Sequence, residues 1–257
     1  MSPVIRIEAG ERRRYADRFR SVSHLRTCVD SVLEGRCGHL FADSVTETAS
    51  VLAPPFWIPV GPSEGAAADE LVSSIDGLGG VIVADDAWQS RVKTACGDRS
   101  SEEQRTPFSA ENLDVSELRA LLVAAPEGVT VTRLDARLAA EAAAGVNAHL
   151  VFETSFATPQ AFEAGGIGFG VILNGTPVAG ASSAFVSDEG IEVQVNTHED
   201  FRGRGFATLA SAALLVACLE RGLTPHWDTG DPVSDRLARR LGYVPLPDYS
   251  MLEVTPP

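Results

Sequence analysis

The segment Arg202-Gly203-Arg204-Gly205-Phe206-Ala207 decides how this chain folds. It lies between an apolar stretch at Ile191 to Thr197, which has the alternation of a strand, and a helical stretch from about Arg204 to Arg221. A strand that enters a glycine-rich turn and then a helix directs several free backbone N–H groups, with the positive end of the helix dipole, at one point. We therefore expect this turn to bind a phosphate group.

The sequence around the turn predicts a sheet of mostly antiparallel strands. Alternating apolar residues on both sides of the pair Asn174-Gly175 predict a β-hairpin, and another strand follows after a short turn. Antiparallel strands before the glycine turn fit neither a P-loop nor a Rossmann unit. The expected elements are strands from Gly168, at Val178 to Val186, at Ile191 to Thr197 and at Thr224 to Thr229, with a further helix at about Pro232 to Leu241.

The N-terminal half has weaker patterns. Apolar residues at steps of three or four predict one amphipathic helix from Glu11 to Leu33, and Gly80 to Ala84 predicts a short buried strand. Gly97 to Asn112 has no apolar period, which predicts a long exposed loop. We expect an N-terminal α/β domain at 1–130 and a second domain at 131–257. The first is a candidate for a diverged copy of the second, although the sequence shows no internal repeat.

Composition indicates an ordinary globular protein of 257 residues, with 44% hydrophobic residues and a mean hydropathy of +0.04. No apolar run approaches the roughly 20 residues that span a bilayer, and a signal-peptide pattern is absent, so we expect a cytoplasmic location. The net charge of −14 argues against nucleic acid or an anionic membrane as a partner. It favours either a cationic small molecule or solubility alone. The four cysteines and five histidines are dispersed, so no disulfide framework or metal site is expected.

The order of the expected elements, together with the glycine turn, resembles the pattern of one enzyme family. The pattern Arg-x-x-Gly-x-Ala, in its strand–turn–helix context, resembles the acyl-CoA-dependent N-acyltransferases of the GNAT superfamily. The resemblance implies an α/β (α+β) fold with a mixed, mostly antiparallel sheet flanked by helices. It covers the chain well from about Phe162 and less well over Leu25 to Phe162. Matches to the branch that includes zwittermicin A resistance protein are Thr197 to Gly205, Trp227-Asp228, Ser234, Leu237-Ala238 and Leu241-Gly242-Tyr243.

The resemblance also implies a donor site without a metal, for acetyl-CoA, another acyl-CoA or an acyl-phosphopantetheine. The strand that ends at Thr197 would splay from the strand that carries Trp227, and the gap would admit the pantetheine arm. Backbone groups at Val195 and Thr197 would hold this arm, because unpaired strand amides need partners. The residues expected to bind the donor are Val195, Asn196, Thr197, Arg202, Gly203, Arg204, Gly205, Phe206, Ala207, Asp231 and Ser234.

The chemistry implied by the resemblance needs a base, because an amine must lose a proton when it attacks a thioester. Glu192 matches the position where many members of the superfamily carry this base, and an exposed strand carboxylate is the alternative interpretation. His226 and Asp228 are the other candidates, and strand alternation puts both on the face opposite Trp227. Trp227 itself is either a core residue or a platform for the substrate.

The last helix departs from the family pattern. Many members have a tyrosine general acid where this chain has Ala238, and an asparagine where it has Asp231. Because a thiol with a pKa of about 8.5 leaves readily, the loss of the acid would slow the reaction without abolishing it. Ser234 or water is the substitute that the sequence offers. Tyr243 belongs to a Leu-Gly-Tyr turn and is expected to pack in the core.

The sequence leaves three functions open. The first is transfer of an acyl group, acetyl above all, from CoA to an amine of a small metabolite or antibiotic. The second takes the acyl group from the phosphopantetheine of a carrier protein in secondary metabolism, so that an acyl carrier protein is a partner. The third is a non-catalytic module that binds acyl-CoA for regulation, which the alanine at 238 favours.

Overall fold

The computed structural model describes residues 4–75, 79–83, 85–123, 125–143 and 155–256, and its chain divides into two compact units. Unit 1 comprises Met1–Arg105 and Asp248–Pro257, and unit 2 comprises Thr106–Pro247. The boundary expected near residue 130 therefore lies inside unit 2. Strand pairing explains the difference, because residues just after Arg105 pair with a strand of unit 2, whereas Tyr249–Val254 pair with strands of unit 1.

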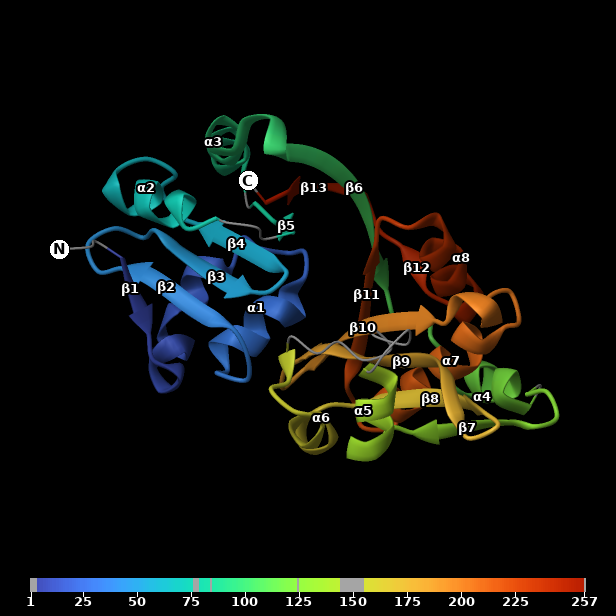
Figure 1. The fold of residues 1–257 in the computed structure, drawn as a ribbon. Coiled ribbons are helices and arrows are strands. Elements are labelled where there is room, and N and C mark those ends of the chain that lie inside the picture. Colours follow the sequence, from blue (N-terminus) through green and yellow to red (C-terminus); the bar gives the residue numbers. More distant parts are fainter. Residues whose placement is uncertain (1–3, 76–78, 84, 124, 144–154, 257) are drawn as a thin grey trace. The chain divides into compact units, whose positions relative to one another are not determined.

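Unit 1 contains a sheet with the strand order β1-β2-β3-β4-β5-β13-β6. Among its described strand pairs, β4 and β5 run parallel and the others are antiparallel. In Figure 1 this unit runs from blue to green, and β13 returns to it in red. Its elements are β1 Val4–Ile7, α1 Arg26–Leu33, β2 His39–Asp43, β3 Ala49–Ala53, β4 Phe56–Val60, α2 Ala66–Ser73, β5 Gly80–Val81, α3 Asp86–Cys96, the first part of β6 Ser100–Ser109, and β13 Tyr249–Val254.

The single helix expected from Glu11 to Leu33 is wrong, because the structure contains two elements there. A 3-10 helix covers Ala9–Phe19, and α1 begins only at Arg26. Leu25, just before α1, has a φ of +48°, a left-handed conformation that an α-helix of L-residues does not continue through. The apolar stripe nevertheless identified buried positions, namely Phe19, Val22, Leu25, Val29 and Val32.

The exposed loop expected at Gly97 to Asn112 is also wrong, because most of this segment is strand β6. Its first part pairs with β13, and its last residues pair with β11 and β12. Within β6 only Phe108 is buried, so the side chains show no apolar alternation. Backbone pairing stabilises this strand, and a hydrophobic pattern cannot detect backbone pairing.

Unit 2 contains five consecutive strands in the order β7-β8-β9-β10-β11, with the end of β6 beside β11. Of the described pairs in this unit, β10 with β11 is parallel and the rest are antiparallel. The elements are α4 Val115–Val123, β7 Val129–Arg133, α5 Ala136–Ala143, α6 Pro159–Gly165, β8 Gly168–Leu173, β9 Thr176–Val186, β10 Gly190–Thr197, a 3-10 turn Glu199–Phe201, α7 Phe206–Leu219, β11 Thr224–Thr229, α8 Pro232–Leu241 and β12 Val244–Pro245.

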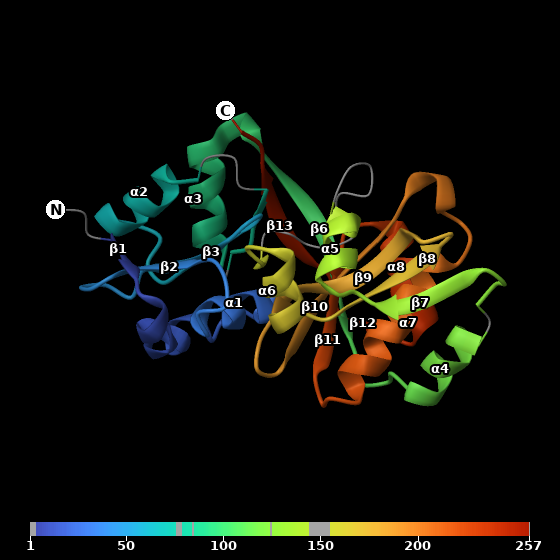
Figure 2. The same cartoon turned by 60° about the horizontal axis from the view of Figure 1, so that its bottom comes forward.

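Alternation along β8 shows that both faces of this sheet are covered. Phe169 and Val171 pack in the cluster of α7, whereas Ile172 packs in a separate cluster with residues of α5 and α6. Successive side chains of a strand point to opposite faces, so α7 covers one face and α5 and α6 cover the other (Figure 2). This burial explains why α7 is apolar nearly all round. In the part of the chain that the structure describes, no helix has the length and hydropathy needed to cross a membrane.

Candidate functional site

Strands β10 and β11 separate part-way along their length. They pair in parallel over Gly190–Glu192 and Thr224–His226, and β10 then continues to Thr197 without pairing to β11. Beyond His226, β11 pairs with β6 on its other side. The register between β9 and β10 also shifts between Glu192 and Val193. The expected splay is therefore confirmed, and the gap between the strands opens immediately after Glu192.

A cavity of about 340 Å³ lies at the wide end of this gap, and we call it the cradle cavity. Four segments form it: the end of β10, the glycine turn, the start of α7 and the start of α8. The cavity therefore brings together most of the residues expected to bind a donor. Arg204 is not among the lining residues, because its guanidinium donates to the Asp200 carbonyl oxygen and lies over the Phe201 ring. The lining residues are Val195, Asn196, Thr197, Phe201, Arg202, Gly203, Gly205, Phe206, Ala207, Asp231, Val233, Ser234 and Leu237.

The glycine turn leaves the N-terminus of α7 open to the cavity. Gly203 and Gly205 have φ angles of +74° and +80°, and a Cβ on either would meet no atom within 4 Å. Gly205 is the N-cap of α7, no side chain caps the helix, and its first turn contains no acidic residue. By contrast, Asp85 caps α3 and Asp231 caps α8. The first N–H groups of α7 therefore remain available to an anion.

The wall formed by β10 contains a further polar group. The Thr197 hydroxyl oxygen is buried and has no hydrogen-bond partner among the described residues. A buried unsatisfied hydroxyl costs about 1–3 kcal/mol. The backbone N–H of Thr197, which we expected to hold the donor arm, instead donates to Asn196 Oδ1 at 2.8 Å. Arg202 Nε donates to the Thr197 carbonyl oxygen at 3.2 Å.

The wall formed by α8 places Ser234 in the cavity and Trp227 behind it. Trp227 Nε1 donates to Ser234 Oγ at 3.1 Å, and the indole is 3% exposed beside Tyr243. Trp227 does not line the cradle cavity, so its position supports the core interpretation rather than the substrate platform. Asp231 accepts a hydrogen bond from the Val233 N–H, which gives this carboxylate a capping role.

Of the three candidate bases, Glu192 and His226 lie at the closed end of the gap, and Asp228 lies two residues further along β11, where this strand pairs with β6. Glu192 is 6% exposed, and His226 is its register partner on β11. His226 and Asp228 are half-buried and Trp227 is buried, which confirms the expected alternation. None of the three candidates lines the cradle cavity. Instead, His226 lines a second cavity of about 750 Å³ at the start of β11.

Tyr243 and Ala238 belong to the core between α7, α8 and β11. The Tyr243 hydroxyl donates to the Pro225 carbonyl oxygen at 2.8 Å, and burial raises the pKa of this phenol well above its usual value. Ala238 has no exposed surface. The expected packing role of Tyr243 is therefore confirmed, and its proton is committed away from the cradle cavity.

A family model described as GNAT acetyltransferase matches residues 20–252. The chain belongs to the GNAT acetyltransferase family. An uncharacterised N-acetyltransferase, YdfB of Bacillus subtilis (strain 168), is 26% identical over 168 residues, which cover 65% of this chain and 62% of the relative. The chain therefore matches less than two thirds of the length of that relative.

Solved structures agree with the GNAT assignment. A GCN5-related N-acetyltransferase-like protein from Streptococcus suis 89/1591 is 26% identical, with a TM-score of 0.83 over 96% of this chain and 100% of that chain. A GCN5-related N-acetyltransferase from Kribbella flavida is 20% identical, with a TM-score of 0.61 over 92% and 94% of the two chains. The latter similarity shows the fold alone. The mixed, mostly antiparallel GNAT sheet flanked by helices is thus the fold expected from the sequence.

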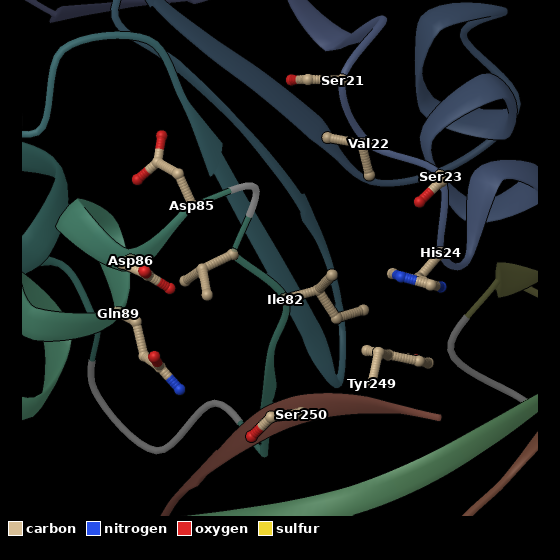
Figure 3. A pocket seen from close by; sticks show the side chains of 11 residues that line it. Ser21, Val22, Ser23, His24, Ile82, Asp85, Asp86, Gln89, Tyr249 and Ser250 are labelled. Atoms are coloured by element: carbon tan, nitrogen blue, oxygen red, sulfur yellow. The ribbon is translucent and has the colours of Figure 1, made fainter. Parts of the chain in front are cut away.

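A separate pocket of about 260 Å³ lies in unit 1 of this GNAT chain. Figure 3 shows Asp85, the N-cap of α3, with Asp86 and Gln89 of α3 on one side and the stacked rings of His24 and Tyr249 on the other. The Asp85 carboxylate caps α3, so the N-terminus of this helix is already occupied. Two carboxylates would repel phosphate groups, which makes this pocket a poor anion site. The sequence did not predict it, because three segments far apart in the chain form it.

Among the described residues, no group of three or more His, Cys, Asp and Glu side chains could hold a metal ion. The polar groups that line the cradle cavity are the open end of α7, the Arg202 guanidinium and the Ser234 hydroxyl.

Proposed function

We propose that this protein transfers an acyl group, in the simplest case acetyl, from the thioester of CoA to an amine of a small molecule. The observation that carries the proposal is the cradle cavity, where an uncapped helix N-terminus meets the open gap between β10 and β11. An anionic head group can lie on the helix end while a thin arm enters the gap. Membership of the GNAT acetyltransferase family supports the same activity.

In this proposal each part of the cavity has a chemical role. The N–H groups at the start of α7 and the Arg202 guanidinium hold the pyrophosphate. The edge of β10 that does not pair with β11 holds the amides of the arm. From Thr197 to Glu192 the strand extends about 16 Å, at 3.3 Å per residue. An arm that runs along this stretch places the thioester at the closed end of the gap, beside Glu192 and His226.

The reaction proceeds by attack of the amine nitrogen on the thioester carbonyl carbon. The C–N bond forms, the C–S bond breaks with its electron pair on sulfur, and the ammonium proton goes to a carboxylate. We assign this proton to Glu192, because it is the last paired residue of β10 before the gap opens. A buried carboxylate at this point can accept the proton where bulk water has little access.

Replacing Glu192 with Gln should lower kcat by about 10²- to 10³-fold, because general-base catalysis typically contributes this much. Affinity for CoA should change little, since Glu192 does not line the cradle cavity. Steady-state assays with a panel of amines, combined with calorimetric titration of CoA, would measure both quantities. Glu189→Gln makes the same change at an exposed turn residue three positions earlier and should retain wild-type kcat. A normal kcat in Glu192→Gln with a large loss in Asp228→Asn would reassign the base.

The acceptor that fits the proposal is a cationic amine, because the net charge of −14 attracts cations. The similarity of the sequence to the branch that includes zwittermicin A resistance protein supports an amino-bearing metabolite or antibiotic. A carrier-protein donor would use only part of the phosphate cradle. Assays that compare free acetyl-CoA with an acetylated carrier protein as donor distinguish the two sources.

Unit 1, we further propose, is a diverged copy of the same fold. The order β2-β3-β4-α2-β5-α3 repeats the order β8-β9-β10-α7-β11-α8, with a parallel pair in the corresponding place, β4 with β5. A tandem GNAT protein from the clavulanic acid biosynthesis pathway has the same overall fold, with 11% identity and a TM-score of 0.58 over 98% of each chain.

The corresponding place in unit 1 is filled by a tryptophan. Trp88 of α3 has no exposed surface, and its Nε1 donates to the carbonyl oxygen of Gly61, directly after β4, at 2.7 Å. The same indole packs in a cluster with Trp57 of β4 and with residues of α2 and β5. A donor arm between β4, α2 and α3 would therefore have to displace the Trp88 indole.

Calorimetric titration should accordingly give one CoA per chain. Trp88 blocks the place in unit 1 that would correspond to the cradle cavity, so the whole of the binding should depend on unit 2. The variant Gly205→Val, which alters only the turn of unit 2, should then leave no site with the wild-type affinity for CoA. A stoichiometry of two, or a second site that survives in Gly205→Val, would contradict the assignment.

A further inference from the structure

Strand β7 is the last strand of the sheet in unit 2. The strand order ends with β9-β8-β7, and among the described residues β7 pairs with β8 alone (Figure 1). Proteins often protect such an edge with a lysine, a proline or a bulge. The sequence of β7 is Val-Thr-Val-Thr-Arg, which contains neither lysine nor proline, and its register with β8 is continuous over all five residues. The outer edge of β7 is therefore suited to pairing with another strand.

Alternate residues of β7 direct their backbone groups to this outer edge. The Leu134 N–H donates to the Gly168 carbonyl oxygen at 2.9 Å, so this pair is hydrogen-bonded between the two strands. Every second pair of an antiparallel ladder is hydrogen-bonded, so both threonines of β7 also direct their backbone groups to β8. Val131 and Arg133 consequently direct their N–H and C=O groups away from β8.

This edge is complementary to a second copy of itself. When two β7 strands pair antiparallel with Val131 opposite Val131, all five residues of each strand have a partner. The N–H groups of Val131 and Arg133 then donate to the carbonyl oxygens of Val131 and Val129 of the other copy. The Val129 N–H is not needed, because it donates to the Pro126 carbonyl oxygen at 3.2 Å. Threonine faces threonine on one side of the ladder, which is a favourable cross-strand pair.

The charges near the two ends of β7 are complementary as well. Arg133 is the last residue of the strand, Glu127 lies in the turn before its first residue, and both are exposed. Antiparallel pairing brings Arg133 of each copy beside Glu127 of the other, so two opposite-charge contacts form. Asp135 also lies near this end, and its carboxylate accepts from the Leu138 N–H at the start of α5.

An apolar groove of about 440 Å³ borders the same edge. A strand pair alone buries little area, whereas a standard interface buries about 800 Å² on each partner. The groove adds apolar area beside the strand, and Val123 at the end of α4 is 87% exposed. The residues that line the groove are Leu122, Ala125, Val131, Phe169, Ala213, Val216, Ala217 and Glu220.

We propose that β7 pairs with β7 of a second copy, so that the sheets of two unit 2 bodies continue into each other across a two-fold axis. The occupant of the edge is a second copy because one strand supplies the donors, the acceptors and both charges that the other requires. Such an interface is isologous and closes at the dimer. The inference is independent of the proposed acyl transfer.

Sedimentation equilibrium over a range of concentrations tests the dimer. The wild type should reach twice its mass of 27.2 kDa. Arg133→Glu places like charges together at both ends of the ladder and should raise the dissociation constant about tenfold or more. The double variant Glu127→Arg/Arg133→Glu restores opposite charges and should return the affinity to near the wild-type value. Arg137→Glu makes the same charge change at an exposed position of α5 and should leave the affinity unchanged.

Disulfide cross-linking tests the register. In Val131→Cys the two new thiols lie opposite each other at a Cα separation of about 5.5 Å, which a disulfide can span, so mild oxidation should give a covalent dimer. Thr130→Cys faces Thr132 of the other copy and should cross-link much less. The wild type, whose cysteines are buried or half-buried, gives the baseline.

A wild type that remains monomeric at submillimolar concentration would overturn the inference. A dimer that is insensitive to Arg133→Glu and does not cross-link through Val131→Cys would do the same, since another surface would then form it. Masses that rise beyond the dimer would indicate head-to-tail association, which also contradicts a two-fold pairing of β7.

Discussion

Gly205→Val is expected to weaken CoA binding by at least about 100-fold. The residue has a φ of +80°, where a β-branched side chain is strongly disfavoured, and the new methyl groups would project into the open space of the turn. Phosphate oxygens could then no longer approach the first N–H groups of α7. Loss of two charge-assisted hydrogen bonds costs about 3 kcal/mol or more, which corresponds to roughly 100-fold in affinity.

Gly175→Val is the matched control for this prediction. Gly175 has nearly the same φ, +83°, and a Cβ there would also meet no atom within 4 Å, but it lies in the β8–β9 hairpin turn. Both variants should lose similar conformational stability, and Gly205→Val should be the one that loses affinity in calorimetric titration with CoA. Equal affinities in the two variants would remove the glycine turn from the donor site.

Trp227→Ala should lower the free energy of unfolding of unit 2 by about 3–5 kcal/mol, the usual cost of removing a buried aromatic ring. The indole is 3% exposed and packs against Tyr243 in the cluster that joins β11, α7 and α8. The substitution would leave a cavity and would also remove the donor to Ser234. Urea denaturation followed by circular dichroism would measure the change.

Two comparisons isolate the cause of this destabilisation. Trp227→Phe retains most of the packing and should cost clearly less than the alanine variant. Val123→Ala removes a side chain that is 87% exposed on α4 and should change stability by no more than about 0.5 kcal/mol. Trp57 and Trp88 remain as fluorescent reporters of unit 1 in every variant. If Trp227→Ala unfolded at the same urea concentration as Val123→Ala, the core position of the indole would be refuted.

Local patterns predicted the elements of unit 2 well. Asn174 and Gly175 both have positive φ, which is the conformation that the hairpin prediction required. Helix α7 ends before Gly222, and α8 ends before Gly242, both glycines with positive φ. These signals are strong because each depends on a few adjacent residues and on the conformational freedom of glycine.

Sequence patterns did not predict the features that depend on residues far apart in the chain. Strand β6 is polar and was expected to be a loop, since its order comes from pairing with β11, β12 and β13 far along the chain. The division of the chain was also misplaced, because β13 returns to unit 1 from the C-terminal end. Likewise, nothing near Trp88 in the sequence indicates that its indole reaches Gly61.

The sequence by itself determined the glycine turn, the strand before it and the helix after it, and with them the family. Local backbone preference is sufficient for this, because the glycines permit the φ angles that the turn needs. Only the tertiary structure decided that β11 leaves β10 after Glu192, that α7 lacks a cap where the cavity opens, and that Trp227 supports Ser234 from behind. These relations join residues far apart in the chain, and the packing of both sheet faces fixes them.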